Sequence, residues 1–132
     1  AMLYAAALAR WGGEAERRLI GTYAAAAVLA DGSLHLARTP WDAPPLYYHV
    51  GAGQAFASPL LRVLFAAGVP RRLDRDRIVD DLAYDWRSDE DSCQYHGVRI
   101  VPLGSHVTIA GDRVQMERWH RPPTPMCGAD YR

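Results

Sequence analysis

The sequence contains no lysine, and its fifteen arginines are balanced by fifteen acidic residues, so the formal net charge is zero. Proteins that bind nucleic acids or anionic membranes through charge present a basic field, which this composition does not supply. We therefore predict no nucleic-acid partner and no membrane partner. The lack of lysine also removes a common phosphate ligand, and no glycine-rich loop opens a predicted helix, so we predict no ATP site and no other cofactor.

Cysteine and long apolar runs are also scarce. Cys93 and Cys127 both lie in polar surroundings, and one pair is a poor disulfide framework for a chain of this size, so we interpret both as free thiols. No apolar run approaches the length of a membrane span. Residues 2–11 lack a basic leader and end at Trp-Gly-Gly rather than at a cleavage site, which predicts a soluble, cytoplasmic protein.

What the sequence does contain is apolar content sufficient for a core, since 49% of its 132 residues are hydrophobic. This length fits one domain. Residues 1–119 are therefore predicted to form one globular unit. Residues 120–132 have the proline content of a tail or linker.

The densest apolar stretch, residues 19–58, predicts two hairpins that form a four-strand meander. Its first strand, residues 23–30, is apolar on both alternating faces, which is typical of a strand covered on both sides. Asp31-Gly32 predicts a two-residue turn before residues 33–38. Three prolines interrupt the pairing before the strand at 46–50, and Gly51-Ala52-Gly53 turns the chain into the strand that ends near Ala57.

Three helical segments are predicted around this sheet. The i, i+4 spacing of Leu3, Ala7 and Trp11 predicts a helix that Gly12-Gly13 ends, followed by a turn in which Glu14 pairs with Arg18. Ser58 and Pro59 predict the start of a second helix, and Asp74 caps a third. Their predicted inner faces are Leu60, Leu61, Leu64 and Phe65 for the second helix, and Ile78, Val79, Leu82 and Ala83 for the third.

The C-terminal part predicts a short strand and a last hairpin. Residues 87–97 are polar and aperiodic, which indicates an exposed loop. Residues 98–101 predict a strand, and residues 106–110 pair with 113–119 across Gly111-Asp112. The predicted fold class is therefore α+β, with antiparallel sheet and packed helices.

A C-x-x-H pair, Cys93 and His96, is the clearest chemical candidate. With His106 or Cys127 it would make a zinc site, but only two of four ligands have suitable spacing, which disfavours metal binding. Cys93 as a nucleophile with a histidine base is the other interpretation. The acidic residues 89–91 would raise the thiol pKa, so a solvated loop thiol is favoured.

The remaining candidates have structural interpretations. Asp80 and Asp81 occupy consecutive helical positions that point in different directions, which favours a solvated helix face over acid–base chemistry. One of Tyr47 and Tyr48 must face the core of a strand pair, so packing outweighs ligand stacking. Three histidines without ligand spacing are interpreted as surface or interface side chains: His35, His49 and His120. No catalytic, cofactor-binding or metal-binding residue is assigned.

Several blocks carry a family resemblance, in particular PLYY at residues 45–48, FAS at 56–58 and GVRIVPLG at 97–104. In this order, from about residue 8 to residue 119, the chain resembles the second half of the class II glutamine amidotransferase domain of asparagine synthetase-like enzymes. That group includes β-lactam synthetases and lasso-peptide cyclases. The resemblance implies an Ntn-hydrolase-like αββα domain, present here in incomplete form.

The resemblance also implies which catalytic parts to expect, and this sequence lacks them. The family hydrolyses glutamine with an N-terminal cysteine whose α-amine is the base and with an Asn-Gly oxyanion hole. Here the chain starts Ala1-Met2, no cysteine precedes Cys93, and no asparagine occurs. The resemblance further implies that the family's upstream half and its ATP-using domain are not part of this sequence. The family's Arg-Asp-Arg-x-Gly motif is RTPWDAP at residues 38–44, and its Glu after Phe-Ala-Ser is Pro59.

The leading functional hypothesis is a non-catalytic scaffold or docking portion of an asparagine synthetase-like, ATP-dependent amide-forming ligase. It would serve the synthesis of asparagine or of natural-product amides or lactams. One alternative is part of a split or longer glutamine-hydrolysing enzyme, and another is a stand-alone protein- or peptide-binding module. Because strand 23–30 has too little chain to cover both faces, we predict a homodimer, or a partner that completes the sheet.

Overall fold

The structure is a computed structural model, and it describes residues 2–84 and 91–121. Its helices and strands are α1 (Met2–Trp11), the 3-10 turn η1 (Gly12–Glu14), α2 (Ala15–Arg18), β1 (Ala24–Val28), β2 (Leu34–Arg38), β3 (Tyr47–Gly51), β4 (Gln54–Ser58), α3 (Leu61–Ala66), α4 (Arg75–Tyr84), β5 (Val98–Ile100), β6 (Ser105–Ala110) and β7 (Arg113–Arg118). None of these helices is both long enough and apolar enough to cross a membrane.

The strands form two antiparallel sheets. Sheet A has the order β1-β2-β6-β7, and sheet B has the order β4-β3-β5. The prediction of one four-strand meander over residues 19–58 is therefore wrong, because β2 and β3 belong to different sheets. The chain changes sheet between them, where Pro40, Pro44 and Pro45 cannot donate to a strand ladder.

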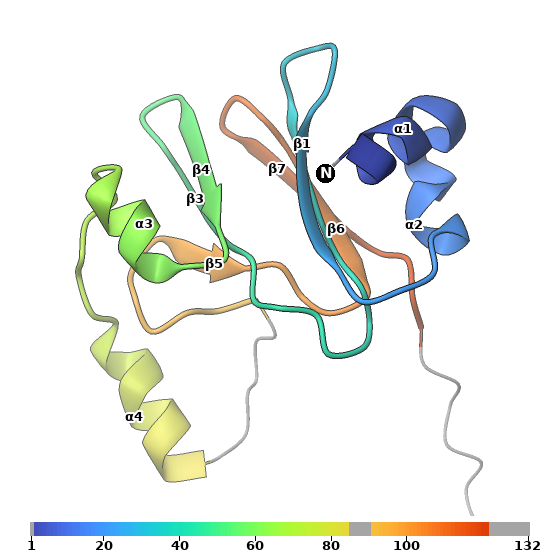
Figure 1. Cartoon of the computed structure of the whole chain (residues 1–132). Helices are drawn as coiled ribbons and strands as arrows, with labels where there is room; N and C mark the ends of the chain where they lie inside the picture. Colours follow the sequence, from blue (N-terminus) through green and yellow to red (C-terminus); the bar gives the residue numbers. More distant parts are fainter. Residues whose placement is uncertain (1, 85–90, 122–132) are drawn as a thin grey trace, which may run out of the picture.

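The two sheets and the helices form successive layers, as Figure 1 shows: α1 and α2 lie beside sheet A, and α3 and α4 lie on the side of sheet B. This arrangement confirms the predicted α+β class with antiparallel sheets and packed helices. The main core contains residues from both sheets and their connections: Leu36, Leu46, Tyr48, Val101, Val107 and Ile109. A second apolar cluster, of Leu64, Val69 and Val98, lies where α3 packs on sheet B.

The turn between β1 and β2 is longer than the predicted two residues. The Leu29 N–H donates to the Ser33 carbonyl at 2.8 Å, so the turn encloses residues 30–32. Gly32 has a φ of 81°, and the Asp31 carboxylate accepts a hydrogen bond from the Ser33 N–H at 2.9 Å. A three-residue turn needs the left-handed conformation at one position, which glycine supplies, and so Asp31 stays in the ordinary region.

The turn between β3 and β4 is the predicted tight turn, and it carries strain. Ala52 and Gly53 both have positive φ, of 51° and 72°. An alanine in the left-handed region costs about 1–2 kcal/mol of stability. Glycine avoids this steric cost but loses more conformational entropy on folding, so only part of the cost is recovered. We therefore expect Ala52→Gly to stabilise the protein by about 0.5–1 kcal/mol, measured by urea unfolding. Ala55→Gly in β4 is the control and should destabilise it, and a loss of stability in Ala52→Gly would contradict the assignment.

Helices α1 and α3 lie close to their predicted positions, with two differences in detail. Helix α3 begins at Leu61 rather than at Pro59, because β4 continues to Ser58, whose hydroxyl accepts a hydrogen bond from the Leu60 N–H at 3.1 Å. Leu60 is consequently exposed instead of buried. Glu14 approaches Arg17 at 4.0 Å rather than the predicted Arg18.

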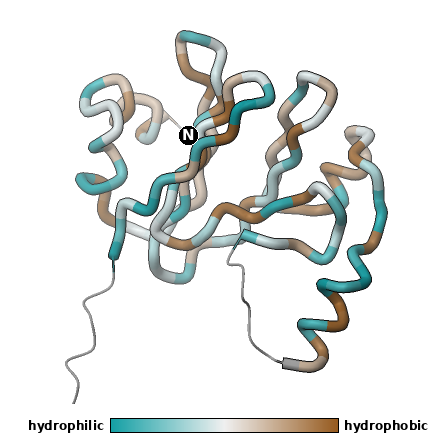
Figure 2. The backbone as a smooth tube through the Cα atoms, turned by 180° about the vertical axis from the view of Figure 1, so that it is seen from behind, coloured by the Kyte–Doolittle hydropathy of each residue, from teal (hydrophilic) through white to brown (hydrophobic). Residues whose placement is uncertain are grey.

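Helix α4 is capped as predicted but packs differently. The Arg77 N–H donates to the Asp74 carboxylate at 3.1 Å. Of the predicted inner face, Val79 and Leu82 are 61% and 83% exposed, so this face prediction is wrong. The helix extends beyond sheet B (Figure 1), and brown apolar and teal polar positions alternate along it (Figure 2). The helix instead buries Arg77, whose guanidinium pairs with Asp81 at 2.9 Å.

The segment predicted as an exposed loop is partly ordered by backbone pairing. Asp74 N–H donates to the Gln94 carbonyl at 2.9 Å, and His96 N–H donates to the Arg72 carbonyl at 2.8 Å. Residues 87–90 of that predicted loop lie outside the described residues. The predicted strand at 98–101 and the hairpin after it are confirmed as β5, β6 and β7. Most of the predicted tail, residues 122–132, also lies outside the described residues.

Candidate functional site

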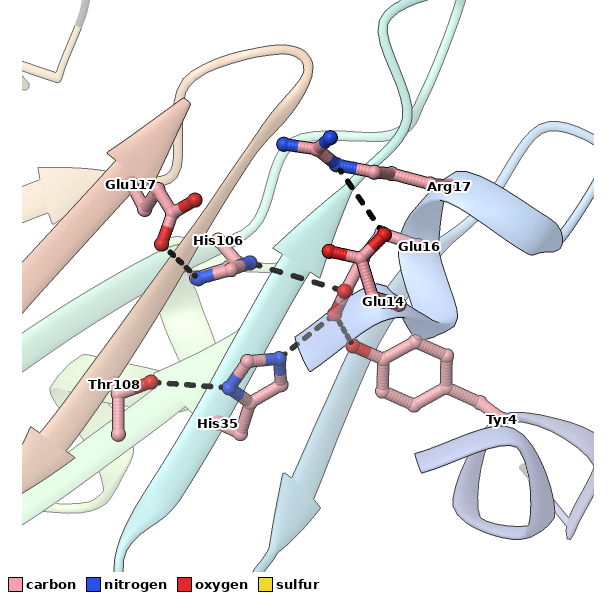
Figure 3. A network of polar contacts seen from close by, with 8 residues as sticks. All are labelled: Tyr4, Glu14, Glu16, Arg17, His35, His106, Thr108 and Glu117. Carbon is pink, nitrogen blue, oxygen red and sulfur yellow. Dashed lines mark hydrogen bonds and ion pairs between the residues drawn. The ribbon is translucent and has the colours of Figure 1, made fainter. Parts of the chain in front are cut away.

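A buried polar cluster lies where α1 and α2 cover sheet A (Figure 3). Side chains alternate along β2, so His35 points away from the main core that contains Leu36. In the register of β2 and β6, His35 is opposite Thr108, and Ala37 is opposite His106. Strand alternation therefore places both histidines on the face that the helices cover.

Glu16 of α2 is the centre of this cluster and is only 1% exposed. Its Oε1 accepts hydrogen bonds from the Tyr4 hydroxyl at 2.6 Å and from His35 Nε2 at 2.8 Å. Burial alone would raise the pKa of this carboxyl, but the hydrogen bonds from His35 and Tyr4 outweigh burial and lower it. Glu16 is therefore a buried carboxylate that stays ionised.

The second carboxylate oxygen of Glu16, Oε2, accepts no hydrogen bond from the described residues. Glu16 Oε2 lies 3.8 Å from Nδ1 of His106, which is beyond hydrogen-bond distance. Both atoms are buried, and neither has a hydrogen-bond partner among the residues that the structure describes. Buried polar atoms are nearly always paired, so this gap requires an explanation.

The outer nitrogens of both histidines face oxygen atoms. Nδ1 of His35 lies 3.0 Å from the Thr108 hydroxyl, and Nε2 of His106 lies 3.7 Å from a carboxylate oxygen of Glu117. Burial lowers the pKa of His106, an effect that the nearby Glu16 carboxylate partly offsets. His106 is therefore neutral near pH 7, with a lone pair available on one ring nitrogen.

A pocket of about 520 Å³ opens onto this cluster. His35, His106 and Thr108 form its polar wall, while α1 and the β1–β2 hairpin provide apolar walls. Small ions and water can therefore reach the histidine side of the cluster. A carboxylate and two imidazoles in such a pocket can hold a proton or a metal ion.

The candidate metal ligands around Cys93, which the sequence disfavours as a site, do not come together among the described residues. Cys93 is a free thiol, as predicted, but it is half-buried against the second apolar cluster rather than fully solvated. The pKa of this thiol is raised as predicted, and burial is the main cause. His96 instead faces the Asp74 carboxylate at 3.3 Å. His106 belongs to the Glu16 cluster, and Cys127 lies outside the described residues.

The other candidates have mainly structural roles. Asp81 pairs with Arg77, and Asp80 is exposed. Tyr48 is buried in the main core, and Tyr47 packs on the second cluster, which confirms the packing interpretation. The surface interpretation of His35 is wrong, because the side chain is buried beside Glu16.

The remaining two histidines of that group are only partly buried. His49 Nδ1 lies 2.7 Å from the Gly97 carbonyl oxygen. The ring of His120 packs edge-on against Trp41, with ring centroids 5.3 Å apart. Neither belongs to the Glu16 cluster.

Comparison with known proteins gives one family match. Residues 3–120 match the model of a family described as glutamine amidotransferase domain. No curated protein matches the chain. The matched range includes both sheets and the buried residues Glu16, His35 and His106.

Proposed function

Because this chain belongs to the glutamine amidotransferase domain family, we propose that it is a non-catalytic scaffold or docking portion of an asparagine synthetase-like, ATP-dependent amide-forming ligase. The state of Cys93 supports the non-catalytic role. Its half-buried thiol has a raised pKa, whereas a nucleophilic cysteine needs a lowered one. The sequence also contains no asparagine to supply a side-chain oxyanion donor.

We expect this chain alone to release no ammonia from glutamine above the buffer rate. Thiol catalysis needs an activated cysteine, whereas burial raises the pKa of the Cys93 thiol. The assay is coupled ammonia detection with the wild type, Cys93→Ala and Cys127→Ala. Ammonia release that Cys93→Ala abolishes would overturn the non-catalytic role.

The docking role is supported by the open edge of sheet A at β1. Ala26 and Val28 are opposite Leu36 and Leu34 in the strand register, so they share the face that points toward sheet B. Sheet B does not cover them, and Val28 is 75% exposed. A groove of about 700 Å³ runs between α1 and β1, and the exposed side chains of Leu3 and Ile20 contribute to it.

On this proposal, the β1 edge receives a strand from a second copy of the chain or from another part of the ligase. Such a strand gains main-chain hydrogen bonds along β1 and buries the exposed apolar side chains in the groove. The same observation favours the second candidate function, a portion of a longer or split glutamine-hydrolysing enzyme. In that case the added strand and the nucleophilic cysteine lie on a part of the enzyme outside this sequence. The intact mass of the native protein tests this candidate, because a longer enzyme would have a larger mass than this chain.

We expect the isolated chain to form a dimer that dissociates on dilution. Sedimentation velocity over a hundredfold concentration range measures this association. Val28→Asp should weaken the dimer, because it places a charge on the β1 edge that dimer formation would bury. Val79→Asp on α4 is the matched control, because it makes the same change at an exposed position away from β1. A monomer at every concentration that also binds no apolar dye would contradict the docking role of this edge.

A further inference from the structure

We propose that Glu16, His35 and His106 form a binding site for one divalent transition-metal ion of the zinc class. The three residues come from α2, β2 and β6, and one ligand atom from each lies within 4.8 Å of the others. Two imidazoles and one carboxylate are a donor set that zinc uses with three protein ligands and one further ligand. This inference concerns metal binding and does not depend on the scaffold role.

The open pair of atoms is the observation that carries this proposal. Glu16 Oε2 and His106 Nδ1 face each other across 3.8 Å, and neither has a hydrogen-bond partner among the described residues. Tetrahedral ligands at about 2.0–2.1 Å from zinc lie roughly 3.3 Å apart. The gap is therefore too long for a hydrogen bond and requires only a small closure to hold a metal ion.

The surrounding groups are arranged as metal-supporting partners. A histidine that ligates a metal through one nitrogen donates its other ring N–H to an oxygen. Thr108 offers its hydroxyl to Nδ1 of His35, and the Glu117 carboxylate lies on the Nε2 side of His106. Because a hydroxyl both donates and accepts, Thr108 satisfies His35 with and without metal.

Glu16 can bind a metal without losing its support. The Tyr4 hydroxyl donates to Oε1 at 2.6 Å and leaves Oε2 open. When a metal ion binds His35 Nε2, the ring proton would move from Nε2 to Nδ1 and donate to the Thr108 hydroxyl. The metal ion then supplies the positive charge beside the Glu16 carboxylate. The adjoining pocket gives an entry path and room for a fourth ligand.

The proposal is tested by titrating the chelator-stripped full chain with Co²⁺ and then displacing Co²⁺ with Zn²⁺. We expect one equivalent of Co²⁺ with the visible absorption of a tetrahedral site. His106→Gln should lower Zn²⁺ affinity at least tenfold, and Thr108→Val about tenfold. His96→Gln is the matched control, because it changes an exposed histidine beside Asp74, and affinity should stay unchanged.

Two results would overturn the site. One is the absence of saturable Co²⁺ and Zn²⁺ binding, which would mean that water or a proton alone bridges the cluster. The other is binding that persists unchanged in both His106→Gln and Glu16→Gln, with circular dichroism confirming that the variants fold. X-ray absorption of the zinc-loaded wild type requires no variant: we expect imidazole scattering, and a sulfur ligand would assign the metal to cysteine instead.

Discussion

Replacing Glu16 by alanine is expected to lower the free energy of unfolding by about 3–5 kcal/mol. The substitution removes the acceptor for Tyr4 and His35 at once, and both groups then remain buried without their partner. Leaving buried donors unpaired costs more than the net value of the original hydrogen bonds. Since domains of this size are stable by only about 5–15 kcal/mol, the loss is a large share of the total.

Urea unfolding in the presence of a chelator measures this effect without a contribution from bound metal. Glu14→Ala is the matched control, because Glu14 is two residues away, and its side chain is 61% exposed. Its 4.0 Å approach to Arg17 should contribute less than about 0.5 kcal/mol. Glu16→Gln keeps the volume and an acceptor oxygen and should fall between the two. A Glu16→Ala variant within 1 kcal/mol of the wild type would refute the central role of this carboxylate.

The parts of the fold that sequence predicts well are those fixed by neighbouring residues. Gly12-Gly13 ends α1, Asp74 caps α4, and Ala52-Gly53 forms a tight turn because each needs only local backbone preferences. Which sheet a strand joins is a different matter. It depends on what the strand packs against, and so the apolar pattern of residues 19–58 did not separate one meander from two sheets.

The packing of helix α4 and the assembly of the buried cluster could not be predicted from the sequence for the same reason. The apolar spacing of Val79 and Leu82 predicts an inner face, but α4 extends beyond the sheet that would bury it. His35 lies between Leu34 and Leu36, a signal that places it on the opposite face of its strand. Only the register of β2 with β6 and the position of α2 bring it to His106 and Glu16, and no spacing in the sequence specifies these.

Leu36→Ala is the second substitution with a large expected effect, a loss of about 2–5 kcal/mol in the free energy of unfolding. Leu36 is fully buried in the main core, so truncation removes apolar contacts and leaves a cavity. Leu82→Ala makes the same chemical change at a position that is 83% exposed and should stay within about 0.5 kcal/mol. Urea unfolding compares the two, and equal effects would contradict the placement of Leu36.

A double-mutant cycle extends this prediction to the two-sheet arrangement itself. Val101 follows β5 of sheet B and belongs to the main core with Leu36, whereas Val98 begins β5 and belongs to the cluster with α3. Residues in one core share a cavity, so Leu36→Ala and Val101→Ala should couple by about 0.5–3 kcal/mol. Leu36→Ala and Val98→Ala should add within about 0.5 kcal/mol, because sheet B separates them. Equal coupling in both pairs would mean that the two sheets do not enclose the main core between them.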